Sequence, residues 1–124
     1  MGALIHYTYA ASSAAYRTRI ALNFKGLAAE ERYVHLLKDG GQQHGAAYAG
    51  VNPQEIVPAL VDDGQAIGQS LAIVEYLDEV YPEPPLLPRA PLARARVRQV
   101  ALAIACDIHP LNNLRVRQYL AGSL

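Results

Sequence analysis

The sequence is short of features that mark several classes of protein. Its single cysteine, Cys106, excludes a disulfide within the chain and fits a reducing compartment. Because Cys106 lies in an apolar helical run, we expect a packed thiol rather than a reactive one. No stretch reaches the ~18 apolar residues of a membrane helix, and the N-terminus lacks a basic region followed by a long apolar one. We therefore expect a cytoplasmic protein.

The chain also lacks an excess of charge. Eleven Lys and Arg residues balance eleven Asp and Glu residues, which gives no support to a nucleic-acid or membrane partner. The charges are unevenly distributed: residues 1–88 hold five basic and ten acidic side chains, whereas residues 89–124 hold six arginines and one aspartate. A length of 124 residues fits one domain, or one domain and part of another. We expect two units of different character to meet near Pro88.

A serine pair stands where a strand is predicted to give way to a helix. Residues 3–8 are typical of a short buried strand, and the following helix is predicted by apolar residues at near-helical spacing: Tyr16, Ile20, Phe24 and Leu27. Gly26 suits the end of that helix. At its start, the hydroxyls of Ser12 and Ser13 can cap free N–H groups or face an anion held by the helix dipole. The stretch alone is consistent with both interpretations.

The next part of the chain predicts a small sheet. Residues 31–37 alternate and predict a second strand, reached by a parallel crossover. A polar loop follows over 38–45, where Gln42 and Gln43 offer amide donors and acceptors, and residues 46–50 fit one helical turn. Residues 59–61 and 65–67 predict an antiparallel hairpin.

Val57-Pro58 directly precedes that hairpin. A proline is tolerated at the first position of a strand. If the bond to Pro58 is cis, the backbone of Val57 turns outward and can pair with an extended, peptide-like ligand.

Two helical patterns occupy the remainder. Residues 69–81 predict a helix that is capped by Ser70. Its apolar face is formed by Leu71, Val74, Leu77 and either Val80 or Tyr81. Its start is a second possible anion site. Five prolines within residues 82–91 predict a semi-rigid linker. Residues 92–120 follow as a long helical pattern that Pro110 should kink or break, which aims His109, Asn112 and Asn113 off its regular face.

Taken together, these motifs resemble the glutathione transferases, and more narrowly their zeta class, the maleylacetoacetate isomerases. The similarity lies in residues 12–22, 38–43, 52–54 with Val57-Pro58, 69–73 and 107–114, and covers nearly the whole chain. It implies an α/β fold: a thioredoxin-like glutathione-binding domain over 1–84, a proline-rich linker over 85–91, and the first helix of an incomplete all-α domain over 92–124.

The resemblance also implies a glutathione site. Ser12 and Ser13 would lie beside the sulfur as catalytic groups, Val57 would pair with the cysteinyl backbone, and Gln69 and Ser70 would take the γ-glutamyl carboxylate. The cofactor-binding residues implied by position are Ser12, Ser13, Ala14, Ala15, Tyr16, Arg17, Gln43, Val57, Gln69, Ser70, His109, Asn113, Leu114 and Arg115. Arg17 and Arg115 would bind a small dicarboxylate substrate. No metal is implied.

The implied reaction is a glutathione-assisted cis–trans isomerisation of a maleyl acid by a homodimeric enzyme of aromatic amino acid catabolism. The chain departs from the family pattern at three places. Ala14 replaces a frequent cysteine, and Ala10 and Ala11 replace an aromatic residue and an arginine. The missing arginine removes a carboxylate ligand, which bears on isomerase turnover more than on glutathione binding.

Other functions fit the same motifs. Maleylpyruvate isomerase has a similar run through Asp107 to Asn113, and a general glutathione transferase or peroxidase is a broader alternative. A non-catalytic glutathione-fold module used for dimerisation is an alternative of another class. Because the chain stops after about one helix of the second domain, we expect poor solubility, or a partner chain that covers the apolar face of residues 97–114.

Overall fold

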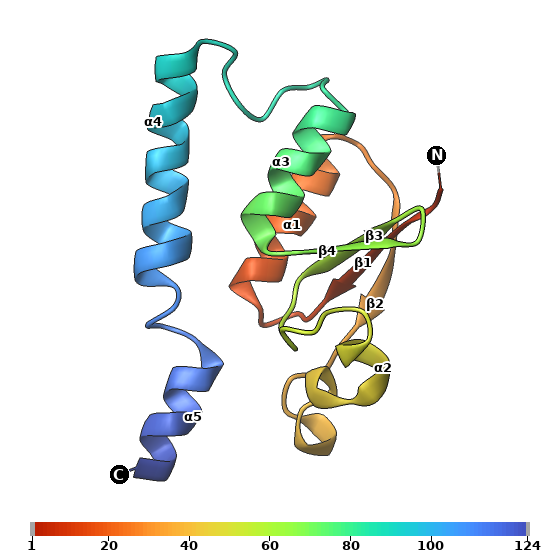
Figure 1. The fold of residues 1–124 in the computed structure, drawn as a ribbon, viewed down its shortest axis with the longest axis vertical. Coiled ribbons are helices and arrows are strands. Elements are labelled where there is room, and N and C mark those ends of the chain that lie inside the picture. Colours follow the sequence, from red (N-terminus) through yellow and green to blue (C-terminus); the bar gives the residue numbers. More distant parts are fainter. Residues whose placement is uncertain (1, 124) are drawn as a thin grey trace. The chain divides into compact units, whose positions relative to one another are not determined.

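The computed structural model describes residues 2–123 and divides into two compact units, one ending at Leu86 and the other beginning at Leu87. The first unit is a four-stranded sheet with helices packed on it (Figure 1). Its elements in chain order are β1 (Leu4–Thr8), α1 (Ser13–Phe24), β2 (Ala29–Tyr33), α2 (Ala46–Ala49), β3 (Ala59–Asp62), β4 (Gln65–Gly68) and α3 (Ser70–Val80). Within residues 2–123, no helix has the length and apolar character needed to cross a membrane.

The sheet has the order β2-β1-β3-β4. β1 pairs with β2 in parallel and with β3 antiparallel, and β4 returns antiparallel to β3. The opening β-α-β unit, the later hairpin and the final helix confirm the predicted thioredoxin-like α/β fold.

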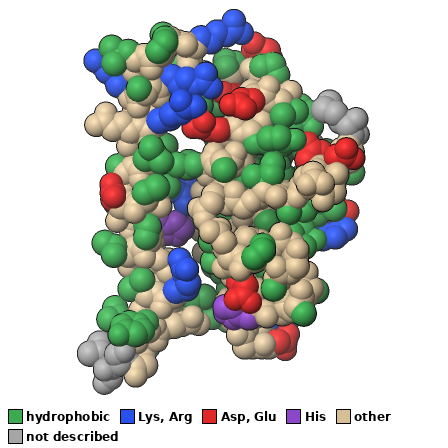
Figure 2. Space-filling view, in the orientation of Figure 1, with side chains coloured by type: hydrophobic (Ala, Val, Ile, Leu, Met, Phe, Trp, Pro, Cys, Tyr) green, Lys and Arg blue, Asp and Glu red, His purple; other side chains and the backbone are tan. Residues whose placement is uncertain are grey.

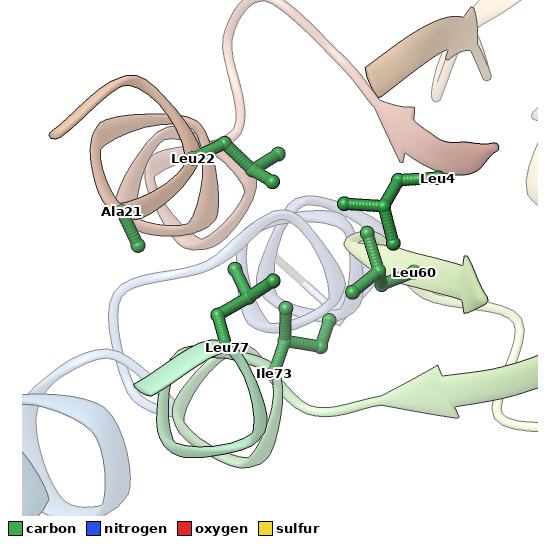
Figure 3. Packing of buried hydrophobic residues seen from close by; sticks show 6 residues of the cluster. All are labelled: Leu4, Ala21, Leu22, Leu60, Ile73 and Leu77. Carbon is green, nitrogen blue, oxygen red and sulfur yellow. The ribbon is translucent and has the colours of Figure 1, made fainter. Parts of the chain in front are cut away.

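The main core lies between the sheet and the helices α1 and α3, which pack side by side (Figure 1). Figure 3 shows the side chains that meet there: Leu4, Ala21, Leu22, Leu60, Ile73 and Leu77. Burying a leucine or isoleucine side chain contributes about 1.5–3 kcal/mol, so this cluster is the principal stabilising feature of the unit.

The apolar stripe that predicts α1 is not the face that the helix buries. Tyr16, Ile20 and Phe24 are each more than half exposed. The buried face instead carries Ala15, Thr18, Ala21 and Leu22. Smaller side chains allow a helix to approach a sheet and a neighbouring helix closely, which explains why α1 turns this face inward.

The second strand begins and ends earlier than predicted, at Ala29–Tyr33 rather than 31–37. Val34 still donates its N–H to Thr8 O at 2.9 Å. The ring of His35 then ends the extended run, because its Nδ1 accepts from the backbone N–H groups of Leu37 and Lys38. β2 is an exposed edge strand with charged residues. Its sequence therefore lacks the apolar alternation that predicts a half-buried strand.

The second unit contains α4 (Pro91–Leu102), a π-helical segment (Ala103–Ile108) and α5 (Leu114–Ser123). The predicted break at Pro110 is confirmed, since residues 109–113 are turns and bends. The expectation of a packed thiol was wrong: Cys106 is exposed, because the π-helical segment around it is largely exposed as well.

The second unit also exposes apolar side chains, which Figure 2 shows as green atoms along its helices. The exposed set includes Val97, Val100, Ile104, Ile108 and Leu111. They belong to the predicted apolar face of residues 97–114.

Candidate functional site

Four connections of the first unit leave the sheet at one edge. β1 and β2 run parallel and end there, with Thr8 beside Tyr33. β3 begins at the same edge, because Ala59 lies beside Tyr7. β4 ends there, with Gly68 opposite Ala59. The segments that follow or precede these ends bring together six residues that the sequence predicts for the site: Ser12, Ser13, Gln43, Val57, Gln69 and Ser70.

A second apolar cluster fixes three of these connections relative to one another. It joins Ala15 in the first turn of α1, Val34 after β2, and Val57 before β3, with Tyr48 and Ala59 between them. All five side chains are buried. The edge is therefore a packed region, and its polar groups are held in place by the core beneath them.

The serine pair has two different structural roles. Ser12 is the N-cap of α1, with extended backbone, and its Oγ accepts from the N–H of Ala15 at 3.1 Å. The Ser12 hydroxyl hydrogen is not used in that bond and can donate to a ligand. Ser13 is the first residue of the helix and is exposed. The helix dipole gives this end a partial positive charge that favours an anion.

The other residues implied near the serines lie in the first turns of α1 but differ in access. Ala15 is fully buried, and its N–H and C=O are already engaged by Ser12 Oγ and Thr18 Oγ1. Ala14 and Arg17 are half-buried and Tyr16 is exposed. Arg19, one turn beyond Tyr16, lies with its guanidinium carbon 5.9 Å from the centre of the Tyr16 ring.

The turn before β3 holds the backbone of Val57 in place. Both Tyr48 Oη and Asn52 Nδ2 donate to the carbonyl of Ile56, at 2.6 and 2.8 Å. The Val57–Pro58 bond is cis. Among residues 2–123, no hydrogen bond engages the N–H or C=O of Val57, so both can pair with an extended ligand.

Tyr48 and Asn52 support the candidate site through the Ile56 carbonyl, and sequence reasoning missed both. Burial raises the pKa of the Tyr48 phenol to about 12, although the neighbouring Asn52 acts in the opposite direction. Tyr48 therefore stays protonated and keeps donating at physiological pH. Asn52 is also buried, and its Oδ1 accepts from the N–H of Gln54 at 3.1 Å. In the sequence, Asn52 lies in the segment 52–54 that carries the family resemblance, which was the available signal for this position.

Gln43 is buried within the loop that follows β2. Its Nε2 donates to the carbonyl of Leu36 at 3.4 Å, whereas its Oε1 is buried and has no hydrogen-bond partner among residues 2–123. Gly41 makes room for this amide, because a Cβ on Gly41 would lie 2.9 Å from its Oε1 and Nε2. An unsatisfied buried carbonyl oxygen is costly, and a ligand that donates to it would remove that cost.

The start of α3 differs from the prediction. Gln69, rather than Ser70, is the N-cap, and its side chain makes no capping hydrogen bond. The predicted Ser70 cap is therefore wrong: the hairpin turns the chain one residue earlier, with Gln69 at φ 67°, and Ser70 becomes the first helical residue and is buried. Gln69 Nε2 donates to Gln54 Oε1 at 2.8 Å on the surface. The first N–H groups of α3 thus keep the capacity to bind an anion.

The other predicted residues belong to the second unit. His109 lies at the break and is half-buried, and Leu114 and Arg115 begin α5. The side chain of Asn113 has a structural use, since its Oδ1 accepts from the N–H of Arg115 at 3.0 Å and its Nδ2 donates to the carbonyls of His109 and Pro110. This amide joins the end of the π-helical segment to the start of α5.

Metal binding has no support in the part of the chain that the structure describes. No group of three or more His, Cys, Asp or Glu side chains within residues 2–123 could hold a metal ion.

Comparison with known proteins extends this picture. Residues 7–85 match the family model of the glutathione S-transferase N-terminal domain. The chain is 54% identical over 124 residues to a probable maleylacetoacetate isomerase of Vibrio cholerae, covering 100% of this chain and 58% of that protein. It is 52% identical to the maleylacetoacetate isomerase of Pseudomonas aeruginosa, over 92% of this chain and 54% of the relative.

Solved structures show the same likeness. A maleylacetoacetate isomerase from Methylobacterium extorquens AM1, with bound malonate and glutathione, is 49% identical with a TM-score of 0.90, over 96% of this chain and 55% of that one. The holo structure of a maleylpyruvate isomerase, described as a bacterial zeta-class glutathione S-transferase, is 45% identical with a TM-score of 0.87, over 94% and 54%. The chain thus spans just over half the length of these relatives. It belongs to the glutathione S-transferase family, and its most similar relatives include members of the zeta class.

Proposed function

We propose that this chain is the glutathione-binding part of a glutathione-dependent cis–trans isomerase of the maleylacetoacetate isomerase type. The observation that carries the proposal is the convergence of Ser12, Val57 and Ser70 at one edge of the sheet. Each offers a different kind of group: a hydroxyl at a helix start, an unengaged strand-like backbone, and a second helix start. Glutathione needs all three, because it combines a thiol, a peptide backbone and a γ-glutamyl carboxylate.

The residues present fit glutathione in their donor and acceptor groups. The N–H and C=O of Val57 would pair with the cysteinyl backbone, and the first N–H groups of α3 with Ser70 would take the γ-glutamyl carboxylate. The buried Oε1 of Gln43 would accept an N–H of the ligand, which would satisfy this buried side-chain acceptor.

The start of α1 with Ser12 and Ser13, which we call the serine end of the site, would lower the pKa of the ligand thiol. A free thiol has a pKa of about 8.5, and a helix N-terminus lowers it. The Ser12 hydroxyl, whose oxygen already accepts from Ala15, is free to donate to the sulfur, and Ser13 is exposed beside it. When bound, glutathione supplies a thiolate that adds to the electron-poor cis double bond of a maleyl acid and departs after rotation about the resulting single bond.

A maleyl substrate carries two carboxylates and therefore needs cations. Arg17, half-buried in α1, and Arg115, exposed at the start of α5, are the proposed ligands. The malonate in the Methylobacterium relative is a small dicarboxylate, which supports a substrate of this class. Ala11, where the family has an arginine, provides no third cation.

A maleylpyruvate isomerase is a second candidate, because a relative of that name from Ralstonia is 46% identical over 92% of this chain. Both activities use the same thiol chemistry and differ in the acid they accept. Measured turnover with each maleyl acid separates them.

We also propose a homodimer in the cytoplasm. The exposed apolar side chains of the second unit, such as Val100 and Ile108, would be covered by a second copy. Light scattering that shows a compact, well-behaved monomer would contradict this assembly.

The function is tested by a spectrophotometric isomerase assay with and without glutathione. We expect isomerisation that depends on glutathione without consuming it. Retention on immobilised glutathione without turnover would leave a binding module, and no retention would contradict the proposal in full.

A further inference from the structure

Two polar side chains are completely buried behind the serine end of the site. His6 in the middle of β1 and Thr18 in α1 both have no exposed surface. They lie on the face of the sheet that carries the main core, among side chains such as Leu4 and Leu60. Buried polar groups need hydrogen-bond partners, and the contact between His6 and Thr18 directly links β1 to α1.

The direction of these hydrogen bonds follows from proton counting. Thr18 Oγ1 donates its single hydrogen to the carbonyl of Ala15 at 2.8 Å. The same oxygen lies 2.7 Å from His6 Nε2, so it must accept there, and His6 must donate from Nε2. His6 is therefore the tautomer with the hydrogen on Nε2 and a lone pair on Nδ1.

This chain of bonds reaches the cap of α1. Ala15, whose carbonyl accepts from Thr18, donates its own N–H to Ser12 Oγ at 3.1 Å. Tyr16 donates its N–H to the carbonyl of Ser12 at 2.9 Å. The position of the Ser12 hydroxyl is thus tied, through Ala15 and Thr18, to the ring of His6.

The second nitrogen of His6 faces a charged pair. Nδ1 lies 3.8 Å from Glu31 Oε1, too far for a hydrogen bond, and has no hydrogen-bond partner within residues 2–123. Glu31, from β2, is held by Arg19 Nε of α1 at 3.3 Å, and a terminal nitrogen of Arg19 donates to Thr8 at 3.1 Å. β3 presents only the apolar Leu60 opposite His6.

We propose that His6 is a positioning residue for the serine end of the site, and that adding a proton to its Nδ1 draws the ring toward Glu31 and loosens the link through Thr18 to Ser12. A charged N–H···O contact is about 2.7–2.9 Å long, so the ring would have to approach Glu31 by roughly 1 Å. That movement takes Nε2, on the other side of the ring, away from Thr18.

Burial supports the neutral form at physiological pH. It lowers the pKa of His6, an effect that the Glu31 carboxylate opposes and the Arg19 guanidinium reinforces. Protonation of His6 Nδ1, and the loosening that follows it, would therefore occur only in acid, below the ordinary titration range of histidine. The consequence for the thiol rests on the proposed glutathione site, whereas the hydrogen-bond chain is a property of the free protein.

The free chain gives the first test. Nuclear magnetic resonance would follow the amide of Ala15 and the ring of His6 over an acid titration of the wild-type chain and of His6→Gln. Glutamine can keep an N–H donor toward Thr18 but cannot be protonated. We expect the chemical shift of the Ala15 amide to change with the same midpoint pH as that of the His6 ring. This change should be absent in His6→Gln. If the chemical shift of the Ala15 amide does not change as His6 titrates, the proposal is overturned.

Calorimetry with glutathione gives the second test. Thr18→Val is nearly isosteric and should weaken binding by about fivefold at neutral pH, because a buried hydrogen bond is lost. Thr18→Ser should bind as wild type, and His6→Gln should bind similarly at neutral pH but lose less affinity in acid. Thermal unfolding checks that each variant is folded, and Ile5→Val, on the opposite face of β1, is the matched control.

The outcomes separate the two claims. Thr18→Val binding as tightly as wild type would refute the positioning role while leaving the glutathione site intact. If the wild-type chain itself does not bind glutathione, the proposed function fails, and the positioning role is decided by the Ala15 amide alone.

Discussion

The buried ion pair between Lys25 and Asp78 provides a quantitative test of how the first unit is held together. Lys25 Nζ lies 2.9 Å from Asp78 Oδ1 and also donates to the carbonyls of Tyr81 and Pro84, at 2.6 and 2.8 Å. All three ammonium donors are therefore used. Asp78 Oδ1 in turn accepts from the N–H of Leu86 at 2.7 Å. The pair joins the end of α1 to the end of α3 and to the segment that closes the unit.

We expect Lys25→Met to destabilise the chain strongly. The Lys25 side chain is 0% exposed and that of Asp78 is 8% exposed, so the variant leaves a buried carboxylate without its cation. Loss of one partner of a buried pair costs about 3–5 kcal/mol. For a unit of this size, that corresponds to a fall in melting temperature of at least ~12 °C.

The assay is urea and thermal unfolding of four chains: wild type, Lys25→Met, Asp78→Leu and the double variant. The double variant should lose less than Lys25→Met alone, because no buried charge is left unpaired. The matched control is Arg32→Met, since Arg32 pairs with Glu30 at 2.7 Å but both side chains are about half exposed, and its loss should have little effect. A Lys25→Met chain as stable as the Arg32→Met chain would refute the assignment of a buried, stabilising pair.

Three further predictions concern the site. Ser12→Ala should destabilise α1 by about 1 kcal/mol in urea unfolding because the cap is lost, whereas Ser13→Ala should change the unfolding free energy by less than about 0.5 kcal/mol. Tyr48→Phe should cost about 1 kcal/mol because the Ile56 carbonyl loses a donor, and it should also weaken glutathione binding. The wild-type unfolding free energy should decline as pH falls below about 6.5, because unfolded chains then bind a proton that folded His6 resists; His6→Gln should remove that part of the decline.

Much of the fold could be predicted from local pattern. The hairpin pattern of residues 59–67, the proline at 110 and the serine at 12 each act within a few residues. The hairpin, the helix break and the helix cap occur where these features indicate. The edge strand β2 was harder to place, because its polar residues carry no burial pattern and its end is set by the ring of His35.

The missed parts of the site depend on how elements pack against one another, which no local pattern indicates. Nothing adjacent to His6 indicates that Thr18 will lie 2.7 Å from its ring, since the bond exists only once α1 packs on β1. The two hydrogen bonds from Tyr48 and Asn52 to the Ile56 carbonyl likewise form only when α2 packs beside the turn. The Ser70 cap failed for a different reason: a backbone at positive φ moved the helix start by one residue.

We propose that one glutathione molecule binds where the four connections meet. Chemical-shift mapping of the labelled chain during a glutathione titration tests it most directly. We expect saturable shifts concentrated at Ser12 and Ser13, at Val57, and at Gln69 and Ser70. The hairpin turn around Gly64, at the opposite end of the strands, should be unaffected. Shifts scattered without relation to these segments, or no saturable shift at millimolar glutathione, would contradict it.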